Sequence, residues 1–176
     1  MRRTNGKKGE QNCQNLITGL FDAKILSTND DGRWDFEALI DDKPLTFEVK
    51  TNPDAFKYGG FSVEIAHKQN SYISSYITRE AFIWDNTKVV KTGLAESKAD
   101  FYIFHDNKKQ YYLVKSKDLK DWANNIVINA KHRVRWGGYE NHTLNIQIRF
   151  EELGDIGMHI DTRKKPGRKS ATEDKA

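Results

Sequence analysis

Two short segments that alternate apolar and polar side chains, joined by a turn, constrain the fold more than any other feature of this sequence. They are residues 34–40 (WDFEALI) and 45–50 (LTFEVK), and the Asp-Asp-Lys-Pro between them is typical of a turn. An alternation of period two is that of a β-strand with one buried face. The sequence therefore predicts a β-hairpin over residues 34–50.

The same alternation decides which polar side chains share a face of the hairpin. In the first strand most apolar residues occupy even positions, so Asp35 points to the opposite face. In the second strand they occupy odd positions, so Glu48 and Lys50 share the polar face. The run 61–65 (FSVEI) alternates as well and, as a further strand, can place Glu64 beside them. We therefore expect these ionisable groups to converge.

Two carboxylates and a lysine on neighbouring strands suit the hydrolysis of phosphodiester bonds. Asp35 and Glu48 can bind one Mg²⁺, or Mn²⁺ in its place, through hard oxygen ligands, while waters and a substrate phosphate complete the coordination. Lys50 can hold the attacking water or help to deprotonate it, since the metal lowers the pKa of that water. Glu64 can position the water or a second metal. These residues predict an enzyme, a metal-dependent phosphodiesterase.

The remaining patterns predict a single α/β domain with a mixed central sheet flanked by helices. Helical periodicity extends over residues 10–26, and Ser116 is a candidate N-cap for a second helix over residues 117–126. Residues 70–98 show no consistent period and are predicted as mixed loop and short elements. Further strands are predicted at residues 101–104 and 111–114, and a second hairpin from residues 133–136 and 143–150.

Charge is divided unevenly between the body of the chain and its ends. The net charge is +4, yet residues 1–9 and residues 162–176 each carry +4, which leaves −4 on residues 10–161. We predict a basic flexible arm, a nuclease-like domain and a basic disordered tail with these bounds. Basic ends on an acidic body suit a polyanionic partner such as DNA. The residues predicted to bind nucleic acid are Arg2, Arg3, Lys7, Lys8, Arg163, Lys164, Lys165, Arg168 and Lys169 in the ends, and Arg133 and Arg135 in the second hairpin.

Composition argues against several other classes of protein. The longest apolar runs, such as residues 81–84, have four residues, whereas a membrane-spanning helix needs roughly 20. The basic start of the chain is not followed by the apolar stretch of a secretory signal. The single Cys13 cannot form an internal disulfide, in agreement with a reducing compartment. We expect no membrane partner and a cytoplasmic location.

Several of these residues together resemble the PD-(D/E)XK nucleases, the superfamily of restriction endonucleases, archaeal-type Holliday-junction resolvases and many small phage nucleases. The resemblance rests on Lys8-Gly9-Glu10 in the first helix, on Asp35 and on Phe47-Glu48-Val49-Lys50-Thr51. It extends more loosely over residues 58–64 and 91–100, where the TGL and SKAD stretches look like those of small phage members. Trp34 stands where the family has proline.

The resemblance implies a restriction-endonuclease-like αβββαβ core with extra strands, carrying a Mg²⁺-dependent DNA endonuclease site. By the same resemblance, Asp35 and Glu48 bind the metal, Lys50 serves the water and Glu10 adds a first-helix acid. The products would carry 5′-phosphate and 3′-hydroxyl ends, and a homodimer is a further expectation because relatives are often dimers. The sequence leaves open whether the substrate is a junction, a duplex site or an end, and whether it is DNA or RNA.

The sequence is compatible with two other interpretations. The main alternative is a non-catalytic nucleic-acid-binding module on the same fold, although an intact set of two acids and a lysine argues against it. His132, Asn141 and His142 supply the residue types of an HNH nuclease, but their order and spacing do not match a ββα-metal unit.

Overall fold

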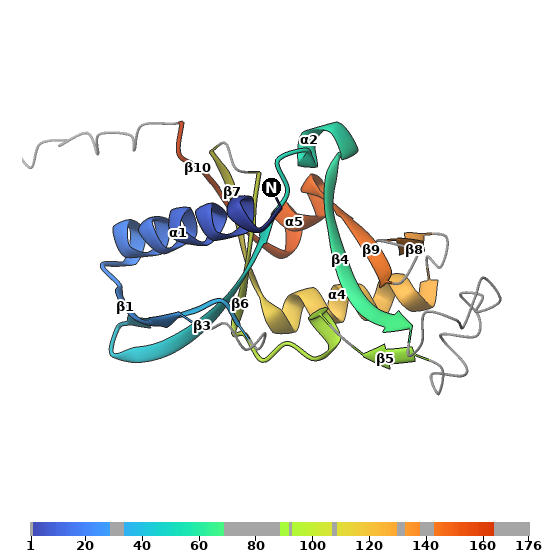
Figure 1. Ribbon diagram of the computed structural model, residues 1–176, viewed down its shortest axis with the longest axis horizontal. Coiled ribbons are helices and arrows are strands. Elements are labelled where there is room, and N and C mark those ends of the chain that lie inside the picture. The colour runs from blue at the N-terminus through green and yellow to red at the C-terminus, as the bar shows by residue number, and fades with distance from the viewer. Residues whose placement is uncertain are drawn as a thin grey trace, which may run out of the picture.

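Two β-sheets and the helices packed on them make up the α/β fold of this single domain (Figure 1). The computed structural model describes residues 2–28, 34–68, 89–91, 93–106, 109–129, 133–137 and 143–163. The six-stranded sheet has the order β1-β2-β3-β6-β7-β10, and the four-stranded sheet the order β5-β4-β9-β8. The six-stranded sheet is mixed, since β3 and β6 run parallel while its other neighbours are antiparallel. The expected fold class is confirmed.

The described elements follow one another along the chain in this order: α1 (Arg2–Phe21), β1 (Lys24–Thr28), β2 (Phe36–Ile40), β3 (Lys43–Thr51), α2 (Ala55–Tyr58), β4 (Gly60–Lys68), β5 (Val89–Lys91), the 3-10 turn η2 (Gly93–Ala95), β6 (Phe101–His105), β7 (Gln110–Lys115), α4 (Ser116–Asn129), β8 (Val134–Gly137), β9 (Thr143–Arg149), α5 (Phe150–Ile156) and β10 (Gly157–Asp161). None of the described helices is long and apolar enough to cross a membrane.

The predicted first hairpin is present as β2 and β3, with Phe36 opposite Phe47 in the register. Its turn is shorter than expected and contains Asp41 and Asp42, whose φ angles of 48° and 60° lie in the left-handed region. Two consecutive residues with positive φ are typical of the type I′ turn, whose twist matches that of the flanking strands. Aspartate tolerates this conformation better than most residues, so the turn closes within two residues.

Helix α1 lies on one face of the six-stranded sheet and begins earlier than the sequence predicted. It starts at Arg2 instead of residue 10, so residues 2–9, expected to form a flexible arm, belong to it. It ends at Phe21, before Asp22 with φ 50°, and residues 24–26, expected to be its last turn, belong to strand β1. The apolar side of α1 packs into a core with the first hairpin, formed by Cys13, Ile17, Phe36, Ala38, Phe47, Ile103 and Tyr111.

A second core lies between the other face of the six-stranded sheet, helix α4 and the four-stranded sheet. Its buried side chains include Tyr102, Phe104, Leu119, Ile146 and Ile148. Helix α4 includes the predicted helix, but the hydroxyl of Ser116 is buried without a hydrogen bond, so the predicted capping bond is not formed. The strands predicted at 101–104 and 111–114 and the second hairpin are present as β6, β7, β8 and β9, although Phe150 begins α5 rather than ending β9.

The most consequential departure from prediction concerns β4. This strand pairs with β5 and β9, in the four-stranded sheet, and not with the first hairpin. Of residues 70–98, for which short elements were predicted, the structure describes β5 and the segment from Gly93 onward, and the rest lie outside the described residues. Since pairing across many residues of sequence is not encoded in the alternation of one strand, the pattern identified β4 but not its partners.

Candidate active site

The first hairpin brings the three predicted site residues together. Asp35 directly precedes β2, and its backbone N–H donates to the carbonyl of Phe47 across the hairpin (2.8 Å). Its carboxylate Oδ2 accepts the backbone N–H of Val49 at 2.6 Å. The Nζ of Lys50 contacts Glu48 Oε1 at 2.6 Å. The predicted convergence of two acids and a lysine is therefore observed, while their chemical roles are a matter of proposal.

Burial and crowding of acids distinguish this cluster from an ordinary polar face of a sheet. Burial, and then the neighbouring carboxylate of Glu48, raise the pKa of Asp35 to about 6, although the Val49 N–H and the Lys50 ammonium lower it. The side chain of Glu48 is only 15% exposed. Two carboxylates held this close in a half-buried site favour a bound cation, which would offset their repulsion.

Helix α1 contributes a further acid, Glu10. Its carboxylate is one of the charges that raise the pKa of Asp35, so the two acids lie close enough for electrostatic repulsion. The helix can approach β3 this closely because Gly9 has no side chain: a Cβ on Gly9 would lie 2.0 Å from Oγ1 of Thr51. Glu10 and Lys50 line one cleft, together with residues 51–54 and the start of β4. Glu10 entered the sequence analysis only through the family resemblance, and the early start of α1 accounts for its position well inside the helix.

Glu64 occupies a different part of the molecule from the one expected. It lies on β4 in the four-stranded sheet, opposite Asn145 of β9. The acids that raise the pKa of Asp35 are Glu48 and Glu10. β4 therefore does not pair with the hairpin, and the expected role of Glu64 beside Glu48 stays a prediction.

The donor set at the hairpin fits a magnesium ion. Within the described part of the chain there is no group of three or more His, Cys, Asp or Glu residues that could hold a metal. A site made by Asp35 and Glu48 would therefore leave several positions to water and substrate, which is how Mg²⁺ is commonly bound. Tyr102, which lies opposite Glu48 on β6, has a pKa raised by burial and by the two nearby acids, so its hydroxyl stays neutral.

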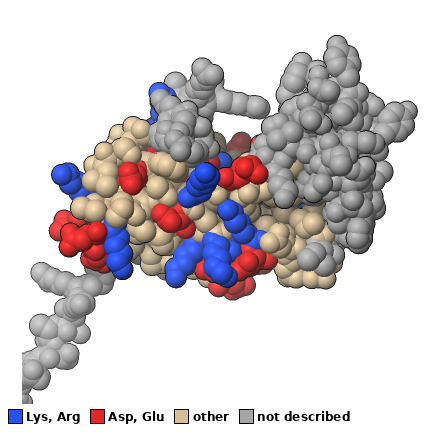
Figure 2. Space-filling view, turned by 90° about the horizontal axis from the view of Figure 1, so that it is seen from below, with Lys and Arg blue, Asp and Glu red and all other residues tan. Residues whose placement is uncertain are grey.

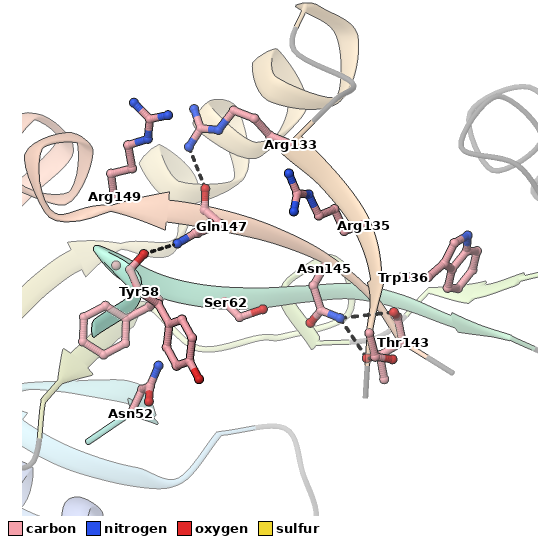
Figure 3. A pocket seen from close by; sticks show the side chains of 13 residues that line it. Asn52, Tyr58, Ser62, Arg133, Arg135, Trp136, Thr143, Asn145, Gln147 and Arg149 are labelled. Carbon is pink, nitrogen blue, oxygen red and sulfur yellow. Dashed lines mark hydrogen bonds between the residues drawn. The ribbon is translucent and has the colours of Figure 1, made fainter. Parts of the chain in front are cut away.

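A second concave surface lies on the outer face of the four-stranded sheet, which Figure 3 shows from close by. Its cavity of about 530 Å³ is lined mainly by polar and basic side chains. The described lining residues are Asn52, Tyr58, Gly60, Phe61, Ser62, Arg133, Arg135, Trp136, Gly137, Thr143, Asn145, Gln147 and Arg149. Three of them, Asn52, Phe61 and Ser62, also line the cleft that contains Glu10 and Lys50, so the two concavities adjoin each other.

The residues predicted to bind nucleic acid fall into different environments. Lys7 and Lys8 are exposed on α1, and Arg135 is exposed on β8. Arg163 donates to both carboxylate oxygens of Asp161. The side chains of Arg2 and Arg3, and all of Lys164, Lys165, Arg168 and Lys169, lie outside the described residues.

Arg133 forms hydrogen bonds and an ion pair inside the protein, whereas Arg135 is exposed. Its guanidinium donates to both carboxylate oxygens of Glu152, each at 2.6 Å, and to the carbonyl of Gln147. It also lies over the ring of Trp122. Both partners of the ion pair are largely buried, so Arg133 stabilises the packing of β8 against α5 and offers little of its charge to a ligand.

Sequence reasoning missed the polar row on β9. The side chains of Asn145, Gln147 and Arg149 point to the outer face while Leu144, Ile146 and Ile148 are buried. This alternation was used to predict the strand, and the polar half of it could also have indicated a binding face.

The comparisons with known proteins are sparse. No protein-family model matches the chain. Among solved structures, the bacterial homing endonuclease I-Ssp6803I is similar at 12% identity, over 94% of this chain and 84% of that chain, with a TM-score of 0.47. A likeness this distant says nothing about the residues of the site.

Proposed function

We propose that this protein is a metal-dependent DNA endonuclease whose active site is built on the first hairpin. The proposal rests on one observation: the carboxylate of Asp35 is bonded to the Val49 N–H, near enough to Glu48 for that acid to raise its pKa, and the ammonium of Lys50 contacts Glu48. Metal-binding acids beside a lysine are the groups that phosphodiester hydrolysis needs, and Lys50 lines a cleft that is open to substrate.

In this proposal each residue has a separate task. Asp35 and Glu48 bind Mg²⁺, or Mn²⁺ in its place, and the Val49 N–H orients the carboxylate of Asp35 for that purpose. The metal, when bound, neutralises charge on the phosphate and lowers the pKa of water. Lys50 holds the attacking water and assists its deprotonation from the same face as Glu48. In-line attack at phosphorus then leaves a 5′-phosphate and a 3′-hydroxyl.

A cleavage assay tests this proposal. Supercoiled, linear, single-stranded and four-way-junction DNA are incubated with the protein in Mg²⁺ or Mn²⁺, with EDTA as the control. We expect metal-dependent cleavage of at least one substrate by the parent protein. Glu48→Gln and Asp35→Asn should abolish cleavage, whereas Glu37→Gln, at an acid on the same hairpin that accepts a hydrogen bond from Ser27, should not.

The non-catalytic alternative gives the opposite result. A binding module would show no cleavage of any substrate with either metal, and Lys50 would act as a phosphate contact whose loss weakens DNA binding. Absence of parental cleavage on all four substrates would reject the endonuclease proposal.

A further inference from the structure

The outer face of the four-stranded sheet presents an ordered row of side chains that can form hydrogen bonds. Arg135 of β8 is opposite Asn145 of β9, and Gln147 is opposite Ser62 of β4. Because side chains two apart on a strand share a face, Asn145, Gln147 and Arg149 all project from β9 to this side (Figure 3). The strands behind them are anchored by buried apolar residues, so the row is held on a rigid support.

The charges that line the cavity on this face are positive, and the one acid of β4 on the same side of the sheet, Glu64 opposite Asn145, is not among the lining residues. The described lining of the cavity contains three arginines and no aspartate or glutamate. Arg133 is neutralised by Glu152, but within the described part of the chain no ion pair involves Arg135 or Arg149. Elsewhere the charges are mixed: Figure 2 shows Lys and Arg side chains next to Asp and Glu on the face seen from below. A local positive surface on a body with a net negative charge selects for an anionic partner.

The two amides of the row are oriented by bonds within the protein. Gln147 Nε2 donates to the carbonyl of Tyr58. Asn145 Nδ2 donates to the carbonyl and to Oγ1 of Thr143, at 3.1 and 2.8 Å. Each bond uses the amide nitrogen and leaves the amide oxygen as an acceptor in a defined direction. Amides with a fixed orientation next to an arginine are suited to recognising the pattern of donors and acceptors on base edges. A surface that binds only phosphates by charge does not need such fixed amides.

The position of this face relative to the hairpin site supports the same partner. Asn52, which follows β3, and Ser62, which begins the exposed row of β4, line both the basic cavity and the cleft with Glu10 and Lys50. A nucleic acid lying on the sheet would therefore pass close to the cleft that contains Glu10 and Lys50.

We propose that this face, the β8-β9-β4 face, binds duplex DNA in its major groove and reads base edges through Arg135, Asn145 and Gln147. The inference rests on the proposed function and deepens it by naming a sequence-specific duplex as the substrate class. The major groove, about 12 Å wide, admits two antiparallel β-strands. Each base pair presents there a distinct pattern of hydrogen-bond donors and acceptors. Arginine pairs with guanine, Gln147, with one amide N–H still free, pairs with adenine, and Asn145 accepts from an exocyclic amino group through its amide oxygen, while Arg149 at the end of the row contacts phosphate.

The test measures binding, so it does not depend on cleavage. The full-length Glu48→Gln protein is used in Ca²⁺ to select from a pool of duplexes with a randomised segment of about 20 base pairs. We expect a preferred sequence to be enriched. Gln147→Ala, Asn145→Ala and Arg135→Ala should each lower affinity for that sequence about tenfold or more and relax the preference at one or two positions.

Matched controls separate reading of bases from other effects. Lys117→Ala and Asn125→Ala remove a charge and an amide from the exposed surface of α4 and should leave both affinity and preference unchanged. Thermal denaturation of each variant confirms folding, and Gln147→Glu, which keeps the length of the side chain, should also lose the preference.

Four outcomes would overturn the proposal. They are a pool that enriches no sequence, row variants that bind the selected duplex like the parent, an equal loss of affinity for all sequences, and tighter binding of single-stranded than of duplex DNA. Selective duplex binding by a protein that never cleaves DNA would uphold this inference and reject the endonuclease proposal, so the two can fail separately.

Discussion

The hairpin site and the β8-β9-β4 face use polar side chains in opposite ways. At the hairpin, acids are brought together and partly removed from water, and the pKa of Asp35 rises to about 6 as a result of that burial and of Glu48. On the β8-β9-β4 face, Arg135, Gln147 and Arg149 are exposed, and amides are oriented by the backbone of neighbouring segments. Catalysis needs groups whose chemistry is altered by their surroundings, whereas recognition needs groups that remain available to a partner.

The largest expected effect is at the metal-binding acids. Glu48→Gln should lower the rate of DNA cleavage by about 10² to 10³ or more, since one carboxylate ligand is lost where charge develops in the transition state. Affinity for DNA on the β8-β9-β4 face should be nearly unchanged in EDTA. Single-turnover cleavage and fluorescence anisotropy measure the two quantities. Equal loss of rate and affinity would show that the two regions do not have separate tasks.

Lys50→Ala should affect the rate almost as strongly. Loss of a group that assists proton transfer typically costs about 10² to 10⁴ in rate. Binding of Mg²⁺ and of DNA should stay within about tenfold, or 1.4 kcal/mol, of the parent. Dissociation constants and single-turnover rates on one substrate decide this. If affinity falls while the parent itself cleaves nothing, Lys50 is a phosphate contact and the hairpin is part of a binding surface.

Within the basic surface, replacing Arg133 should mainly affect stability, whereas replacing Arg135 should mainly affect DNA binding. Arg133→Ala leaves the half-buried Glu152 without its partner and should reduce the free energy of unfolding by about 1–3 kcal/mol. Arg135→Ala should leave stability within about 0.5 kcal/mol, because Arg135 is exposed, and weaken DNA binding instead. Chemical denaturation and anisotropy measured on both variants make the comparison. A stable Arg133→Ala protein with impaired DNA binding would reverse the assignment.

A smaller effect is expected in the pH dependence of stability in EDTA. The pKa of Asp35 is raised in the folded protein to about 6, above its unfolded value, so the folded state binds the proton more tightly. The resulting stability is fully present below the unfolded pKa and is lost as pH rises through about 6. Between pH 4 and pH 7.5 the free energy of unfolding of the parent should fall by about 2 kcal/mol because of Asp35. In Asp35→Asn this part of the fall should be absent.

Denaturation at the two pH values with and without Mg²⁺ sharpens this prediction. Added Mg²⁺ should stabilise the parent at pH 7.5 and have little effect on Asp35→Asn, because the ion offsets the repulsion between Asp35 and Glu48. Glu37→Gln serves as the control and should follow the parent. A parent whose stability at pH 7.5 does not respond to Mg²⁺ would argue against a metal site at the hairpin.

Much of the hairpin site was determined by the sequence alone. An alternation of period two is a local property, so it was sufficient to predict β2 and β3 and to bring Asp35, Glu48 and Lys50 together. The same is true of the second hairpin, where alternation predicted the strands that carry Arg133 and Arg135. The mixed α/β fold also followed from such local patterns.

Tertiary structure decided what depends on pairing between distant segments. Only the fold placed β4, which carries Glu64, next to β9 in the second sheet, and only the close contact of Gly9 with Thr51 brought Glu10 toward Asp35. Likewise Arg133 and Arg135 are two residues apart and chemically identical, yet Glu152 of α5 neutralises the first and leaves the second exposed. The alternation of a strand specifies its faces, but the choice of partners rests on packing free energies summed over the whole chain, which no single segment encodes.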